Sequence, residues 1–280
     1  MLNVLITGAS SGIGEALARE FAGRGARLGL IARRVDKLQA LASSLPGDHF
    51  CYGADVSKKD DIIAAAMQFE KDTGGADIVI ANAGISVGVL TEYYEDLDVF
   101  ADVLNTNVLA MAYTFHPFVA PMRARGQGKL VGIASVAGIR GLPGSEAYCA
   151  SKAATISYCE SLRNELKRFG IQVITISPGF VRTPLTERNT YGMPFLMDAP
   201  DFARKAVDAI TAGDSFKVIP WQMGWVARLM RILPNWVFDK AMGNRAYKPR
   251  KQAAAKTALA EAPAPPASSA LAAPDNTPSK

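Results

Sequence analysis

A glycine-rich turn between an apolar run and a helical pattern opens the chain, and it constrains the fold more than any other feature. Residues 2–6 form a short apolar run that predicts a buried strand, and residues 15–22 have helical spacing. The turn between them carries Gly8, Gly12 and Gly14. Glycine lets a backbone approach a pyrophosphate closely, and a helix N-terminus attracts phosphates. Strand, turn and helix in this order therefore predict a dinucleotide-binding unit. A tight strand-to-helix turn without a ligand is the alternative.

Apolar runs alternate with helical patterns along most of the chain. Helical segments are predicted between strands near residues 2–6, 27–31, 49–53, 77–81, 129–134, 172–176 and 216–219. This alternation predicts an α/β fold, a single doubly wound parallel sheet of the Rossmann type, over residues 1–220. Ligands bind beyond the carboxyl ends of the strands in such sheets. The chain has 280 residues, which is enough to bury a large core without disulfides or metals.

Two arginines follow the second predicted strand. An acidic residue here would bond the ribose 2′-hydroxyl of NAD, whereas an arginine accommodates the 2′-phosphate of NADP. The chain has Arg33 and Arg34 at this place and no acid before Asp36. Basic side chains are slightly unfavourable at a helix start unless they have a partner. The sequence therefore favours NADP(H) over NAD and predicts that Arg33 sets this choice, with ordinary surface charge as the alternative.

Tyr148 and Lys152 are four residues apart, and Ser135 comes thirteen residues before the tyrosine. Positions i and i+4 share one face of a helix, so the ammonium can lie close to the phenol. A free phenol has a pKa of about 10, and a nearby cation lowers that value. A lowered pKa would suit proton exchange with a carbonyl or hydroxyl oxygen. The alternative is an amphipathic helix with an ordinary surface lysine.

Taken together, these motifs resemble the short-chain dehydrogenase/reductase family from about residue 2 to about residue 220. The resemblance implies a catalytic tetrad of Asn107, Ser135, Tyr148 and Lys152. It also implies cofactor contacts by Gly8, Ser10, Ser11, Gly12, Ile13, Gly14, Arg33, Arg34, Asp55, Val56, Asn82, Ala83, Gly84, Tyr148, Lys152, Pro178, Gly179, Val181 and Thr183. A homodimer or homotetramer is expected on the same ground.

The function implied is an NADP(H)-dependent oxidoreductase that interconverts a carbonyl and a secondary or primary alcohol. Ser135 is expected to polarise the carbonyl, Tyr148 to donate the proton, and Lys152 to lower the pKa of Tyr148 and bind the nicotinamide ribose. Asn107 is expected to hold a water that links Lys152 to solvent. An apolar stretch at 193–197, within a predicted substrate lid at 185–198, favours reduction of a hydrophobic or lipid-like ketone. Such a carbonyl reductase has two rivals: a non-catalytic NADP-binding sensor, and a membrane-surface protein on the same fold.

The C-terminal part has a different composition. Residues 221–251 form a basic extension that holds all three tryptophans, Trp221, Trp225 and Trp236. Eight basic residues and one acid lie between Lys217 and Lys251. One predicted helical face carries Trp225, Val226, Leu229, Ile232 and Leu233. The sequence predicts that this extension packs on its own domain or on a second subunit. The alternative is contact with an anionic membrane surface. Residues 252–280 are rich in Ala and Pro and are predicted to be disordered.

Composition excludes several classes of protein. Three cysteines and two histidines have no metal-ligand spacing, so no metal site and reduced thiols are expected. No signal peptide and no run of about 18 apolar residues is visible, which favours a cytoplasmic protein, with membrane association through residues 221–251 as the alternative left open. No motif supports nucleic-acid binding. The expected partner is a small-molecule carbonyl or alcohol.

Overall fold

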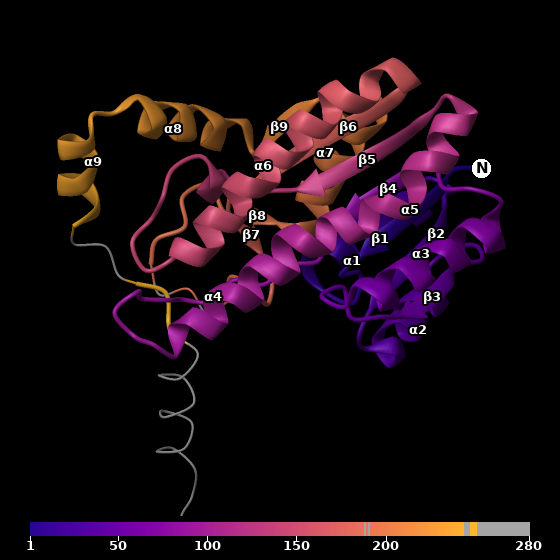
Figure 1. The fold of residues 1–280 in the computed structure, drawn as a ribbon, viewed down its shortest axis with the longest axis horizontal. Helices are drawn as coiled ribbons and strands as arrows, with labels where there is room; N and C mark the ends of the chain where they lie inside the picture. Colours follow the sequence, from indigo (N-terminus) through magenta and orange to yellow (C-terminus); the bar gives the residue numbers. More distant parts are fainter. Residues whose placement is uncertain (188, 190, 244–246, 251–280) are drawn as a thin grey trace, which may run out of the picture.

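The computed structural model describes residues 1–187, 189, 191–243 and 247–250. Its centre is a sheet of seven parallel strands in the order β3-β2-β1-β4-β5-β6-β9. The strands are β1 (Asn3–Thr7), β2 (Arg27–Ala32), β3 (Phe50–Gly53), β4 (Ile78–Ala81), β5 (Gly128–Ile133), β6 (Ile171–Pro178) and β9 (Phe216–Ile219). The predicted doubly wound parallel sheet is confirmed (Figure 1).

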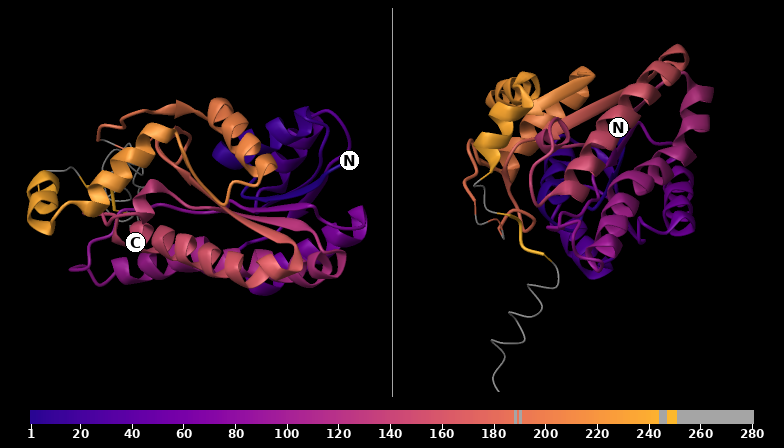
Figure 2. Two further views of the ribbon diagram at one scale, coloured as in Figure 1. Left: turned by 90° about the horizontal axis from the view of Figure 1, so that it is seen from above. Right: turned by 60° about the vertical axis from the view of Figure 1, so that its left-hand side comes forward.

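Helices cover both faces of the sheet (Figure 2, left). One face packs against α1 (Gly12–Gly23), α2 (Val35–Ser43) and α7 (Ala199–Ala212). The other packs against α3 (Lys59–Thr73), α5 (Ala110–Arg125) and α6 (Glu146–Leu166). Helix α4 (Asp96–Leu104) runs into α5 through the π-helical segment Asn105–Leu109. Short 3₁₀ helices at Val136–Gly138 and Lys167–Phe169 follow β5 and α6.

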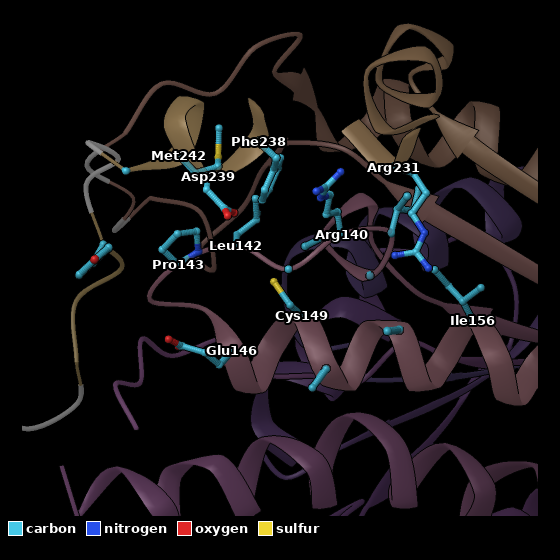
Figure 3. Close-up of a pocket in the computed structure, with 18 of the residues that line it drawn as sticks. Arg140, Leu142, Pro143, Glu146, Cys149, Ile156, Arg231, Phe238, Asp239 and Met242 are labelled. Carbon is cyan, nitrogen blue, oxygen red and sulfur yellow. The ribbon is translucent and has the colours of Figure 1, made fainter. Parts of the chain in front are cut away.

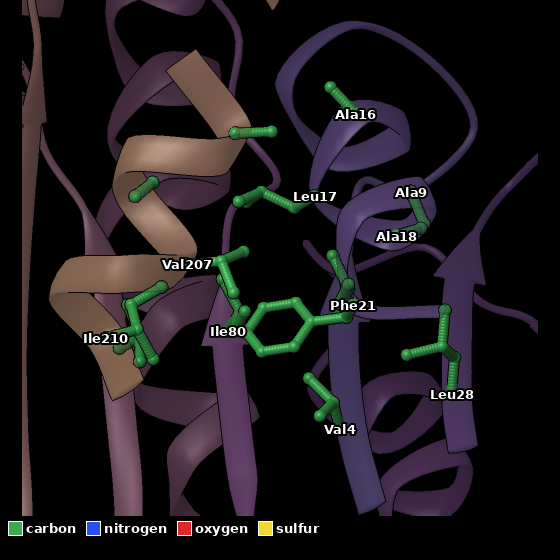
Figure 4. Packing of buried hydrophobic residues seen from close by; sticks show 14 of the residues in the cluster. Val4, Ala9, Ala16, Leu17, Ala18, Phe21, Leu28, Ile80, Val207 and Ile210 are labelled. Atoms are coloured by element: carbon green, nitrogen blue, oxygen red, sulfur yellow. The ribbon is translucent and has the colours of Figure 1, made fainter. Parts of the chain in front are cut away.

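Each face has its own apolar core. On the α1 and α7 side, Phe21 points from α1 toward Val4 and Ile80 of the sheet, beside Val207 of α7 (Figure 4). On the opposite face, the ring of Phe69 lies where a side chain at position 29 would be. A Cβ on Gly29 would come within 2.5 Å of that ring, so the aromatic residue requires glycine on the facing strand. Burial of a phenylalanine contributes roughly 1.5–3 kcal/mol.

The chain reverses direction across the sheet between β1 and β4. From β1 it proceeds outward to β3, and it then returns to place β4 on the other side of β1. A crevice opens at the carboxyl ends of strands where the order reverses in this way, and ligands bind there. The glycine-rich turn follows β1 and Asn82 follows β4, so both lie at this crevice.

The C-terminal part adds a two-stranded ribbon and two helices. Strand β7 (Val181–Arg182) pairs with β8 (Met197–Asp198), and α8 (Trp221–Ile232) and α9 (Asn235–Met242) follow the sheet. Met223 and Ala227 of α8 are buried and pack near Val136, which attaches the helix to the domain. The loop after β5 is attached as well, because Arg140 donates to the carbonyl oxygens of Met230 and Leu233.

The apolar face predicted for α8 does not pack on the domain. Trp225, Leu229 and Ile232 are 63%, 57% and 77% exposed, and Trp221 and Trp236 are exposed as well. The buried face consists instead of small and flexible residues that the periodicity did not single out, Met223 and Ala227. The predicted disordered tail, 252–280, lies outside the described residues.

Candidate active site

The glycine-rich turn is interlocked with the end of β4. Gly8 has φ +68°, and a Cβ there would come within 2.8 Å of the Cα of Ala83. A Cβ on Gly14 would come within 2.3 Å of the carbonyl oxygen of Gly8. The amide of Asn82 donates to the carbonyl oxygen of Thr7 at 3.0 Å. Side chains are therefore excluded where the turn meets the start of α1 and the end of β4, and this stretch of bare backbone is here called the glycine cradle. This geometry fits the pyrophosphate of a dinucleotide.

The two arginines after β2 have different surroundings. Arg34 Nη2 donates to the hydroxyl oxygens of Ser10 at 3.0 Å and Ser11 at 3.3 Å. The Arg33 side chain is 75% exposed, and its Nη1 lies 4.0 Å from Oδ2 of Asp55. One guanidinium and two hydroxyls thus meet next to the first turn of α1. Such a set of donors fits a phosphate monoester.

The remaining predicted cofactor residues lie along the same edge of the sheet. Because all seven strands are parallel, the segments that follow their carboxyl ends are neighbours. Gly12 approaches the ribbon closely, since a Cβ on it would lie 3.3 Å from the Cβ of Thr183. The others are Ile13 in α1, Asp55 and Val56 after β3, Ala83 and Gly84 after β4, Pro178 at the end of β6, Gly179 after it, and Val181 in β7.

Asn107 belongs to the π-helical segment and is 1% exposed. Its Oδ1 accepts from the backbone N–H of Ile85 at 2.8 Å. Its Nδ2 donates to the carbonyl oxygen of Ile85 at 3.0 Å and to the hydroxyl of Ser151 at 2.9 Å. The side chain therefore fixes the loop after β4 against α6. The water contact expected for Asn107 stays a prediction.

Lys152, Tyr148 and Ser135 come together where β5 ends and α6 begins. Lys152 is buried, and its ammonium donates to the carbonyl oxygen of Ile133 at 2.7 Å and lies 5.8 Å from the centre of the Tyr148 ring. Burial lowers the pKa of Lys152 to about 8. Ser135 Oγ accepts from the backbone N–H of Ala137 at 3.2 Å and forms a hydrogen bond with Tyr148.

The pKa of Tyr148 differs from the sequence-based expectation. Burial raises it to about 12, although the hydrogen bond with Ser135 acts in the opposite direction. Lys152 does not lower it in this structure. The physical reason is that loss of water around the phenol destabilises the phenolate, and the ammonium of Lys152 is engaged with a backbone carbonyl. A spacing of four residues could not reveal either effect.

The C-terminal segment brings to this site two residues that were not predicted from the sequence. The ammonium of Lys248 lies 5.6 Å from the centre of the Tyr148 ring and donates to the hydroxyl of Ser86 at 2.6 Å. Arg250 binds the carboxylate of Asp96, with a distance of 2.6 Å from Nε to Oδ2. Both residues were counted among the basic residues expected on the surface of the extension. No sequence signal marks them, because Lys248 and Tyr148 are far apart along the chain.

A cavity of about 940 Å³ lies beside this site (Figure 3). Cys149 points into it from α6, Leu142 from the loop after β5, and Phe238 from α9. Ser135, Tyr148 and Lys152 do not line it, so the cavity is adjacent to this cluster and does not contain it.

The described part of the chain contains neither a helix able to span a membrane nor a cluster of metal-binding side chains. No helix there is long and apolar enough to cross a membrane. No group of three or more His, Cys, Asp or Glu among the same residues could hold a metal ion.

A parallel sheet with a glycine cradle at its reversal point and a Ser–Tyr–Lys cluster beside it defines an oxidoreductase of the dinucleotide-binding α/β class. The family model for short chain dehydrogenases matches residues 2–193, and the chain belongs to that family.

Relatives and solved structures agree with this assignment. An uncharacterized oxidoreductase of Myxococcus xanthus is 38% identical over 240 residues, which cover 85% of this chain and 94% of that protein. A short-chain dehydrogenase from Sphingobium yanoikuyae in complex with NADPH is 27% identical, with a TM-score of 0.72, covering 84% of this chain and 97% of that one. A 3-ketoacyl-(acyl-carrier-protein) reductase from Brucella melitensis complexed with NADH is 28% identical, with a TM-score of 0.69, covering 78% and 94%.

Proposed function

We propose that this protein is an NADP(H)-dependent oxidoreductase that interconverts a carbonyl and a secondary or primary alcohol, and that it reduces a hydrophobic ketone. The observation that carries the proposal is the cluster of Tyr148, Ser135 and Lys152 next to the glycine cradle. Hydroxyl, phenol and ammonium are the groups needed to bind and protonate a carbonyl oxygen. We place the reaction in the cytoplasm.

In this function Ser135 donates a hydrogen bond to the substrate carbonyl oxygen and thereby polarises it. Tyr148 donates its proton to the same oxygen. A pKa of about 12 keeps the phenol protonated at neutral pH, which suits the direction of reduction. Lys152 binds the ribose and Asn107 holds the loop after β4 in position. When bound, the nicotinamide supplies the hydride.

The choice of NADP(H) rests on the cluster of Arg34, Ser10 and Ser11. Solved relatives include a complex with NADPH and another with NADH, so the likeness alone does not decide between the two cofactors. A charged guanidinium with two hydroxyls favours the cofactor that carries the additional phosphate.

The test is reduction of a panel of hydrophobic ketones and aldehydes by the purified protein with NADPH, with Tyr148→Phe as the comparison. The variant keeps the ring and loses the proton, so turnover is expected to fall by about 10²- to 10⁴-fold. NADPH binding, measured by fluorescence titration, should persist. A variant that keeps more than about a tenth of the turnover would refute the assigned acid. NADPH binding without turnover of any carbonyl by the wild type would favour the non-catalytic sensor.

We also propose that α8 and α9 contact an anionic membrane surface. Their exposed apolar stripe, defined as Trp221, Trp225, Leu229, Ile232 and Trp236, supports this. Arg228, Arg231 and Lys240 lie on the same helices, and the guanidinium of Arg228 lies 5.4 Å from the Trp225 ring. Tryptophan and basic residues together suit the headgroup region. The alternative is that a second copy of the chain, within a homodimer or homotetramer, covers this apolar stripe. The test must distinguish membrane binding from this contact.

A further inference from the structure

The C-terminal segment Tyr247–Arg250 returns from α9 to the active site. The backbone N–H of Gly88 donates to the carbonyl oxygen of Pro249 at 3.2 Å, and Gly88 forms a parallel bridge with Arg250. The Arg250 guanidinium lies 3.4 Å from the centre of the Tyr93 ring. The last described residues of the chain are therefore fixed to the loop that follows β4.

Three features elsewhere in the chain accommodate this segment. A Cβ on Gly88 would lie 2.1 Å from the carbonyl oxygen of Lys248, and one on Gly144 would lie 2.8 Å from the Cβ of Tyr247. Asp96 is 2% exposed, and its carboxylate requires the cation of Arg250, which contacts both carboxylate oxygens. Residues from three distant parts of the sequence thus accommodate the segment Tyr247–Arg250 in one position. This indicates that the segment is an ordered part of the site.

Docking brings the ammonium of Lys248 to the catalytic tyrosine. It lies between Ser86, at 2.6 Å from Oγ, and the Tyr148 ring, at 5.6 Å from its centre. The lysine is half-buried, and burial lowers its pKa to about 8, so the amine remains mostly protonated at pH 7.

No ion pair with a carboxylate is found for this ammonium within the described part of the chain. The neighbouring cations have their own partners: Lys152 donates to the carbonyl oxygen of Ile133, and Arg250 binds Asp96. Lys248 donates one hydrogen bond to the neutral hydroxyl of Ser86 and has further N–H groups that can donate. The O–H of Ser86 can donate as well. A half-buried cation with unused donors is stabilised by an anion.

We propose that Lys248 and Ser86 form a subsite for an anionic group of the substrate, so that the preferred substrate is an amphipathic keto acid. This inference rests on the proposed carbonyl reduction, because it places the carboxylate next to the carbonyl that Tyr148 protonates. The apolar part of such a keto acid agrees with the proposed hydrophobic substrate. Its carboxylate gives Lys248 a partner, which a purely apolar ketone would not provide.

The experiment compares aryl keto acids of increasing chain length with their methyl esters. The variants are Lys248→Met, which removes the charge, and Lys248→Arg, which keeps it, with Lys205→Met, an exposed position on α7, as the control. Losing a charge-assisted contact should raise KM for the acids about tenfold or more. KM for the esters should change far less, and kcat for the acids should fall less than kcat/KM. Lys248→Arg should recover much of the acid preference, and Ser86→Ala should lower it by less than Lys248→Met.

Equal changes for acids and esters, or no preference for acids in the wild type, would overturn the subsite. Failure of the proposed function gives a different result, because no carbonyl would then be turned over with NADPH. In that case, the affinity of the wild type and of Lys248→Met for the aryl keto acids, measured by calorimetry, still tests the subsite. Weaker binding to the variant supports the subsite, and equal binding refutes it.

Discussion

Arg33 and Arg34 are neighbours in the sequence, but only Arg34 is bonded to the glycine-rich turn. We predict that Arg34→Ala weakens NADPH binding about tenfold or more, because a charge-assisted contact contributes roughly 1.5–3 kcal/mol. NADH binding should change little. Arg33→Ala should have a smaller effect, since the side chain is 75% exposed and screened by water. Fluorescence titration with both cofactors measures this, and Arg163→Ala on α6 is a matched control. An equal loss for NADPH and NADH would contradict the 2′-phosphate assignment.

Single residues also show where sequence reasoning reaches its limit. The spacing of Tyr148 and Lys152 was sufficient to predict that they lie together, because helical periodicity is local. The predicted direction of the pKa shift of Tyr148 was wrong, because the shift depends on burial by distant segments. Lys248 was missed for the same reason: its contact with Ser86 joins residues 162 positions apart.

Among the elements, the docked segment Tyr247–Arg250 is the one that a small change can displace. In Gly88→Ala the added Cβ would clash with the carbonyl oxygen of Lys248, so the segment must move. We predict a loss of roughly 1–3 kcal/mol of stability and faster amide exchange in residues 86–90. Thermal unfolding and mass-spectrometric hydrogen exchange measure these effects. Gly23→Ala is the control, because nothing lies within 4 Å of its added Cβ. Unchanged exchange in 86–90 would mean that the segment is not held there.

Elements were predictable in proportion to their length and periodicity. The run in β6 gave a clear strand because apolar residues follow one another in a buried parallel sheet. The pair β7 and β8 was not predicted, since strands of two residues leave no periodic signal. The helical extension was expected, but the sequence left open whether its apolar face packs on the domain or points outward. Periodicity identifies an apolar face without showing what covers it, and here Met223 and Ala227 attach α8 to the domain.

The whole molecule has a formal net charge of +5 and carries its exposed apolar stripe on α8 and α9. We predict that the full chain floats with anionic vesicles and much less with neutral ones. The triple variant Trp225→Ser, Leu229→Ser and Ile232→Ser should lose at least about tenfold in vesicle binding, since each buried apolar side chain contributes up to roughly 1.5–3 kcal/mol. Its turnover in the proposed carbonyl reduction should persist, because these side chains are exposed to solvent. If the triple variant has a smaller mass in solution than the wild type but floats equally well, the stripe is instead a contact between copies of the chain.

The return of residues 247–250 to Tyr148 has a consequence for the order of assembly during translation. Domains fold from the N-terminus at about 5–20 residues per second, so the 100 positions between Tyr148 and Lys248 represent roughly 5–20 s of synthesis. The glycine cradle and Arg34 emerge well before that interval begins. A nascent chain can therefore form the proposed nucleotide site before the segment that carries Lys248 has been synthesised. The proposed anion subsite is the last part of the described chain to be completed.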